Sequence, residues 1–179
     1  MKLSTLSILL GLGFALPNIY GLTKPVAFAA AARKFPRSEI AGYVLTLLAT
    51  VWFLFNLNRE GIADFESFKR PLLCFFGVLG ILTCIYLRDF LAVRGLALVL
   101  LLLAKTVVDT ARWEKSEWHL VLVTWAYAWI FAGMWFTVSP WRLRDLILWS
   151  TANEKRVKIS CGIRLAFGAL VAALGMFVF

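Results

Sequence analysis

Six apolar stretches, separated by short polar segments, dominate the pattern of this chain. They cover residues 3–22, 40–57, 71–87, 89–110, 120–138 and 159–179. An α-helix rises ~1.5 Å per residue, so stretches of this length approach the ~30 Å hydrocarbon core of a membrane. The pattern predicts an all-α, polytopic membrane protein with about six transmembrane helices, embedded in a lipid bilayer.

Two shorter amphipathic segments follow the first and the fifth stretch, at 25–35 and 141–152. In the first, apolar side chains repeat at i, i+3, i+4 and i+7, opposite Arg33 and Lys34. The members of this apolar face are Phe28, Ala31, Ala32 and Phe35. Both segments are predicted to be short interfacial helices.

The chain is predicted to be a single domain over 1–179, arranged in three parts. A unit of span, interfacial segment and span covers 1–57, a central hairpin covers 71–110, and a second such unit covers 119–179. The two outer units have the same order and orientation, which suggests a degenerate parallel repeat.

Basic residues predict the orientation. Eleven Lys and Arg residues fall in the connections after spans one, three and five, and six fall on the opposite side, which includes the charge-balanced loop 58–70. By the positive-inside rule, both termini are non-cytoplasmic and the interfacial helices face the cytoplasm, as expected in a bacterial inner membrane.

Composition excludes several classes of protein. With 61% hydrophobic and only 16% charged residues, the 179-residue chain has no room for a separate soluble catalytic domain. The net charge of +9 lies beside apolar segments, where anionic lipid headgroups explain it better than nucleic acid does. Three cysteines without CxxC spacing and a single histidine predict no metal site and no haem.

The fourth stretch carries the strongest candidate site. Only ten residues separate Arg94 from Lys105, which is ~15 Å of helix, so at least one of these cations must lie inside the membrane or extend out of it. Asp109 follows Lys105 by four residues and shares its helix face, so each charge can neutralise the other. An intramembrane pair indicates function, whereas the alternative is an ordinary contact at a solvated helix end. Arg94, Arg112 and His119 form a second candidate, a polar boundary cluster.

Two further surfaces are predicted from residue type. Trp118, Trp125 and Trp129 share one face of the fifth stretch, where packing against a helix is the simpler interpretation and a bound lipid or quinone the alternative. Gly168, Ala172 and Gly175 form a small-residue stripe on which another helix can pack closely. Arg164, on the same stretch, can extend back toward the interface.

No motif for nucleophilic, metal-assisted or nucleotide-dependent catalysis is present, so the sequence predicts neither an enzyme nor a cofactor. Two functions remain. The first is a non-enzymatic accessory or structural subunit that packs against other integral membrane proteins. The alternative is a small-solute or ion transporter, or the substrate-binding component of one, which uses Lys105 and Asp109.

Overall fold

The computed structural model describes residues 2–59, 68–114 and 116–179 and contains six long helices. They are α1 (Leu3–Thr23), α3 (Glu39–Arg59), α4 (Lys69–Tyr86), α5 (Leu91–Ala111), α6 (His119–Val138) and α8 (Glu154–Phe177). Each is long and apolar enough to cross a membrane, and no strand occurs in these ranges, so the predicted all-α polytopic fold is confirmed. Most of the predicted loop 58–70, and Lys115, fall outside the described residues.

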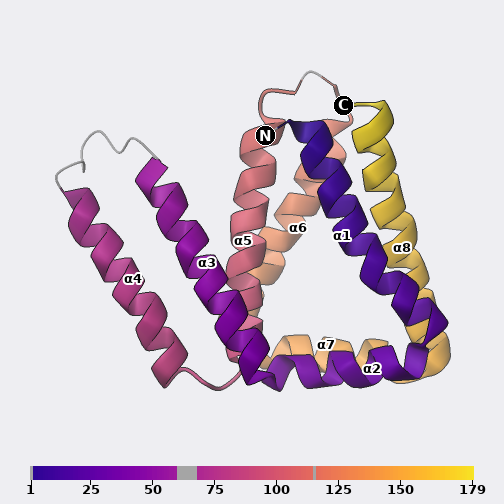
Figure 1. The fold of residues 1–179 in the computed structure, drawn as a ribbon. Coiled ribbons are helices and arrows are strands. Elements are labelled where there is room, and N and C mark those ends of the chain that lie inside the picture. The colour runs from indigo at the N-terminus through magenta and orange to yellow at the C-terminus, as the bar shows by residue number, and fades with distance from the viewer. Residues whose placement is uncertain (1, 60–67, 115) are drawn as a thin grey trace.

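Two short helices, α2 (Pro25–Lys34) and α7 (Trp141–Ser150), occupy the positions predicted for interfacial segments. They lie side by side across one end of the bundle, roughly at right angles to the long helices, and both chain termini lie at the other end (Figure 1). A 3₁₀ turn, η1 (Phe35–Arg37), leads from α2 into α3. The Arg33 guanidinium joins the two short helices, because its Nε donates to Thr151 Oγ1 at 2.9 Å and a second nitrogen donates to the Thr151 carbonyl.

The closest helix pair is α1 with α8. A Cβ on Gly11 would lie 2.5 Å from the backbone nitrogen of Ala172, and one on Gly168 would lie 2.9 Å from the Gly11 carbonyl oxygen. At Gly175, the nearest atom would be the Ser4 carbonyl oxygen, at 2.8 Å. The predicted small-residue stripe therefore lies in a seam within this chain, where backbones approach closely.

The helices predicted to form a central hairpin do not pack mainly on each other. The short connection after α4 does lead directly into α5, through Phe90 in a left-handed conformation (φ 56°). However, α3 lies between α4 and α5 and packs on both (Figure 1). Gly95 explains this, because a Cβ there would lie 2.8 Å from Leu45 Cβ and 2.9 Å from Thr46 N on α3. The small residues of α3 and α5 thus favour this pair.

The core is concentrated at the end of the bundle that carries the termini. There α1, α5, α6 and α8 meet through eight buried side chains, namely Leu3, Leu6, Ala104, Val107, Ala111, Leu122, Ala126 and Val171. Toward α2 and α7, the pair α1 and α8 diverges from α5 and α6 (Figure 1). In each of the outer units α1–α3 and α6–α8, a short transverse helix lies between two long helices that run in opposite directions (Figure 1).

Candidate functional site

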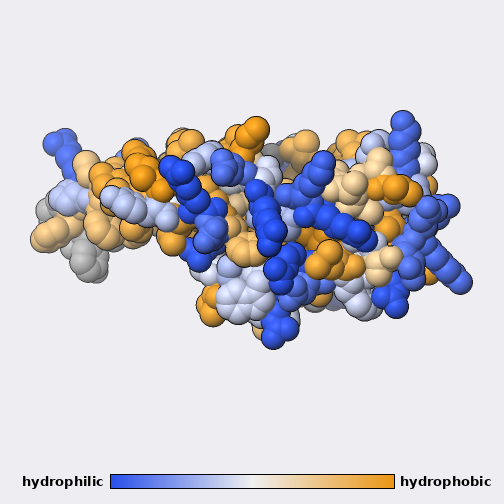
Figure 2. All heavy atoms as spheres, turned by 90° about the horizontal axis from the view of Figure 1, so that it is seen from below, coloured by the Kyte–Doolittle hydropathy of each residue, from blue (hydrophilic) through white to orange (hydrophobic). Residues whose placement is uncertain are grey.

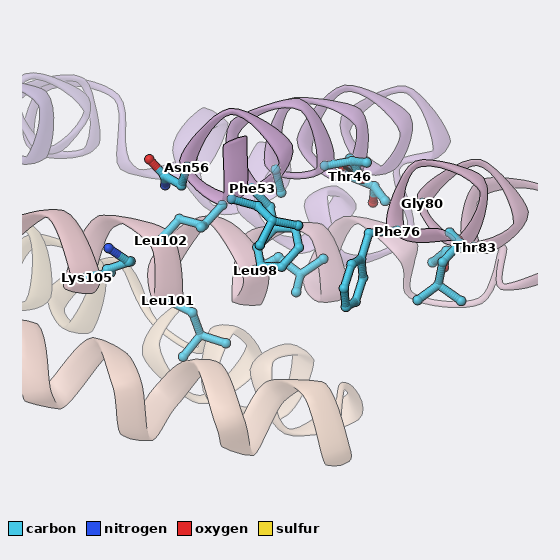
Figure 3. A pocket seen from close by; sticks show the side chains of 14 residues that line it. Thr46, Phe53, Asn56, Phe76, Gly80, Thr83, Leu98, Leu101, Leu102 and Lys105 are labelled. Carbon is cyan, nitrogen blue, oxygen red and sulfur yellow. Dashed lines mark hydrogen bonds between the residues drawn. The ribbon is translucent and has the colours of Figure 1, made fainter. Parts of the chain in front are cut away.

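A cleft of about 430 Å³ lies between α3, α4 and α5, within the size range of roughly 300–1,000 Å³ found for small-molecule sites. Its middle is apolar. Phe53 of α3 and Phe76 of α4 meet edge to face with ring centroids 5.0 Å apart, and Leu98 and Leu102 of α5 lie opposite them (Figure 3). An apolar molecule or an acyl chain is the type of ligand that this part of the cleft can accommodate.

Two polar groups in the wall of the cleft have no hydrogen-bond partner. Thr46 is only 1% exposed, and its hydroxyl oxygen is buried without a partner, as is Nδ2 of Asn56. These residues lie ten positions apart on α3, which is ~15 Å along the helix. A buried polar group without a partner costs ~1–3 kcal/mol. The Thr46 hydroxyl oxygen lies beside Gly95 of α5, since a Cβ there would be 2.9 Å from it, so a molecule in the cleft reaches this oxygen once the Thr46 side chain turns.

The other hydroxyls of the cleft are satisfied within their helices. Thr50 Oγ1 donates to the Thr46 carbonyl and Thr83 Oγ1 to the Leu79 carbonyl, both at 2.8 Å. The free hydrogen-bonding capacity is thus concentrated at Thr46 near one end of the cleft and at Asn56 near the other.

The Lys105–Asp109 pair lies at the Asn56 end. Lys105 lines the cleft, and its Nζ lies 2.7 Å from Asp109 Oδ2. The side chains are 44% and 51% exposed, so the pair lies at the surface of this chain rather than buried in it. Lys105 precedes the last residue of α5 by six positions, ~9 Å along the axis, which places the pair closer to the membrane boundary than to the middle. It forms a polar mouth for an otherwise apolar cleft.

The predicted boundary cluster is divided between two ends of the molecule. Arg94 lies in the first turn of α5, while Arg112 follows its last residue, eighteen positions and ~27 Å further along. His119 begins α6 at the same end as Arg112, and its Nδ1 contacts the Ser116 carbonyl. Arg94 and the other two residues therefore cannot act on one ligand.

Side chains of neighbouring helices in this chain cover most of the tryptophan face. Trp125 stacks on Trp129 with ring centroids 4.3 Å apart, and it meets Phe14 of α1 at 5.2 Å and Phe167 of α8 at 4.9 Å. Trp118 precedes α6 and is exposed. This arrangement agrees with helix packing for Trp125 and Trp129 and with a boundary position for Trp118.

Sequence reasoning did not identify Thr46, Asn56 or the cleft itself. The available signal was the presence of Thr46, Thr50 and Asn56 inside one predicted span, four and six residues apart. Polar residues within a span are uncommon and face protein more often than lipid. The sequence does not show that α4, and not lipid, lies against this face of α3, so it could not assign these residues to a cleft.

Among the described residues, no three His, Cys, Asp or Glu side chains lie close enough together to hold a metal ion. Comparisons with protein-family models, with characterised proteins and with solved structures give no match. The assignment of the candidate site therefore depends on the geometry of this chain alone.

Proposed function

We propose that this chain binds a small apolar molecule with hydrogen-bond acceptors in the cleft between α3, α4 and α5, as the membrane-embedded binding component of a carrier. The single observation that supports this most strongly is a cleft of about 430 Å³ whose wall holds the buried, unpartnered hydroxyl of Thr46. The proposed role is binding and release, without a reaction.

The chemistry of the lining favours a neutral ligand. The Asn56 amide nitrogen offers hydrogens, and the Thr46 hydroxyl can donate or accept. Lys105 is the one cation in the described part of the lining, and its charge is already balanced by Asp109. A carbonyl or ether oxygen on an apolar body matches these groups better than a second charge does.

The packing of α4 suggests that a ligand can enter the cleft from the lipid beside this helix. Cys84 is the only residue of α4 that is buried, and the helix packs chiefly on α3. Close approach depends on Gly80, where a Cβ would lie 2.5 Å from atoms of Thr50. A small movement of α4 along this contact would widen the cleft toward the lipid, which suits a ligand that arrives from the bilayer.

Filling the cleft is expected to reduce binding of prodan, a naphthalene dye with one ketone acceptor, by about tenfold, which equals ~1.4 kcal/mol. Leu98→Trp fills it, and Leu82→Trp is the control, because Leu82 is similarly exposed (41% against 39%) but does not line the cleft. Dye fluorescence is titrated against protein in nanodiscs, with empty nanodiscs as the blank. Equal binding by both variants would place the dye elsewhere. Asn56→Leu should shift emission to the blue by removing a donor.

An accessory role beside other membrane proteins is the second candidate, and the outer face of α4 favours it. Phe75, Ile81 and Tyr86 are all exposed on a helix that this chain barely covers. Extraction in mild detergent followed by native mass analysis separates the two proposals. Protein chains that co-purify at fixed stoichiometry support the accessory role, and a lone chain that retains a small molecule supports the binding role.

We also propose that both termini are non-cytoplasmic in a bacterial inner membrane. The side that carries α2 and α7 holds eleven basic and four acidic residues in its connections, and hydrophilic side chains gather there (Figure 2). In a cysteine-free background, Trp113→Cys should react with an impermeant thiol reagent in cells with a permeabilised outer membrane, and Asn153→Cys should not. Both positions are exposed, on opposite sides. The reverse pattern would invert the orientation.

A further inference from the structure

A second and larger chamber, of about 730 Å³, lies where the long helices diverge above α2 and α7. Its walls come from α2, α5, α6, α7 and α8. The apolar face predicted for the segment 25–35 lines it, through Phe28, Ala31, Ala32 and Phe35. This face is therefore directed at the chamber, which is open to the outside of the bundle. The chamber does not touch the cleft described above, with which it shares no lining residue.

Among the residues that the structure describes, Arg164 is the only charged one in the lining of this chamber. It lies five positions after residue 159, where the apolar stretch begins, which is ~7.5 Å into the span, and its side chain is exposed at the edge of the chamber. Within the described ranges it forms no hydrogen bond or ion pair with the protein. No carboxylate from residues 2–59, 68–114 or 116–179 lines the chamber.

An intramembrane guanidinium is costly unless an anion or water balances it. Helical side chains point toward the helix N-terminus, so Arg164 extends from within the span toward the level of α2 and α7. The connections on that side carry eleven basic against four acidic residues, so anions are concentrated there. Among anions, a phosphate suits arginine best, because its oxygens accept two parallel hydrogen bonds.

We propose that the chamber holds one anionic phospholipid of the surrounding leaflet, with its phosphate on Arg164 and an acyl chain along the apolar walls. Charge complementarity selects the headgroup, since the described lining carries the positive charge of Arg164 and no negative charge. The apolar faces of α2 and α7 and the end of α6 select the chain, through residues such as Phe28, Ile147 and Phe136. The bound lipid would thereby occupy the space between the two diverging helix pairs and link them to α2 and α7.

Native mass analysis of the full chain tests this directly. The protein is reconstituted in bilayers of phosphatidylglycerol and phosphatidylcholine with identical acyl chains, so that only the headgroup differs. We expect one phosphatidylglycerol retained per chain. Arg164→Gln should lower that preference about tenfold, the factor that corresponds to ~1.4 kcal/mol. Lys158→Gln is the matched control, because it removes one exposed cation from the same helix outside the chamber lining.

Two further experiments can contradict the proposal. Ala32→Phe fills the chamber without altering charge and should also reduce retention, even if Arg164→Gln proves too unstable to purify. Excess inorganic phosphate should not displace the lipid, because the acyl chain contributes to binding. Equal loss in Arg164→Gln and Lys158→Gln, unchanged retention in Ala32→Phe, or displacement by phosphate alone would each overturn it, and would instead indicate diffuse attraction to the basic face.

Discussion

Gly11→Leu is expected to destabilise the chain by about 3 kcal/mol, the upper end of the usual overpacking cost. A side chain at Gly11 would meet the backbone of α8, at 2.5 Å from Ala172 N and 2.6 Å from Gly168 O. Backbone atoms cannot rotate away, so the whole helix must move. Because helix association in a bilayer depends on close van der Waals packing, the displaced pair loses much of its attraction.

Gly13 provides the matched control on the same helix, because a Cβ there would meet nothing within 4 Å. Unfolding of the purified protein in mild detergent with increasing SDS measures the difference. Gly168→Leu should resemble Gly11→Leu, while Gly13→Leu and Cys74→Ala, at an exposed cysteine, should unfold near the wild-type midpoint. Equal shifts for Gly11→Leu and Gly13→Leu would mean that α1 and α8 do not meet through this seam.

The elements of the fold could be predicted because hydropathy and proline mark them locally. Pro25 begins α2 and Pro140 immediately precedes α7, so the transverse helices were recognisable from sequence alone. The neighbours of each helix could not be predicted in the same way. Gly11 and Gly168 are 157 positions apart, and nothing in either segment specifies the other. Small residues show that a helix can be approached closely, but they do not show by which partner.

The candidate site was predicted only in part, for a related reason. The spacing of Lys105 and Asp109 was sufficient to predict their contact, which depends on one helix alone. The sequence left open whether the pair lies within the membrane or at a solvated helix end, and in the structure both side chains are about half exposed. The cleft beside them depends on α3 lying between α4 and α5, and the predicted hairpin had placed α4 directly against α5. The order in which α3, α4 and α5 pack side by side thus determines which polar residues share a site.

Replacing one partner of the Lys105–Asp109 pair is expected to destabilise the protein more than replacing both. Lys105→Ala leaves the Asp109 carboxylate without its ammonium partner at the mouth of an apolar cleft. In lipid, a lone charge costs up to ~2.5–3.5 kcal/mol at mid-membrane, and less here because the pair lies near the end of α5. The double change removes both charges. A double-mutant cycle should therefore give a coupling energy of about 1–2 kcal/mol.

Arg144 and Asp145 supply the control cycle. Their contact, at 3.0 Å, has nearly the same exposure, 40% and 47% against 44% and 51%, but it lies on the transverse helix α7. A water-exposed pair contributes roughly 0.2–1 kcal/mol and is weakened by salt. If both cycles give equally small coupling with the same salt dependence, water surrounds Lys105 and Asp109. The pair is then an ordinary helix-end contact, and the polar mouth of the cleft reduces to Asn56 alone.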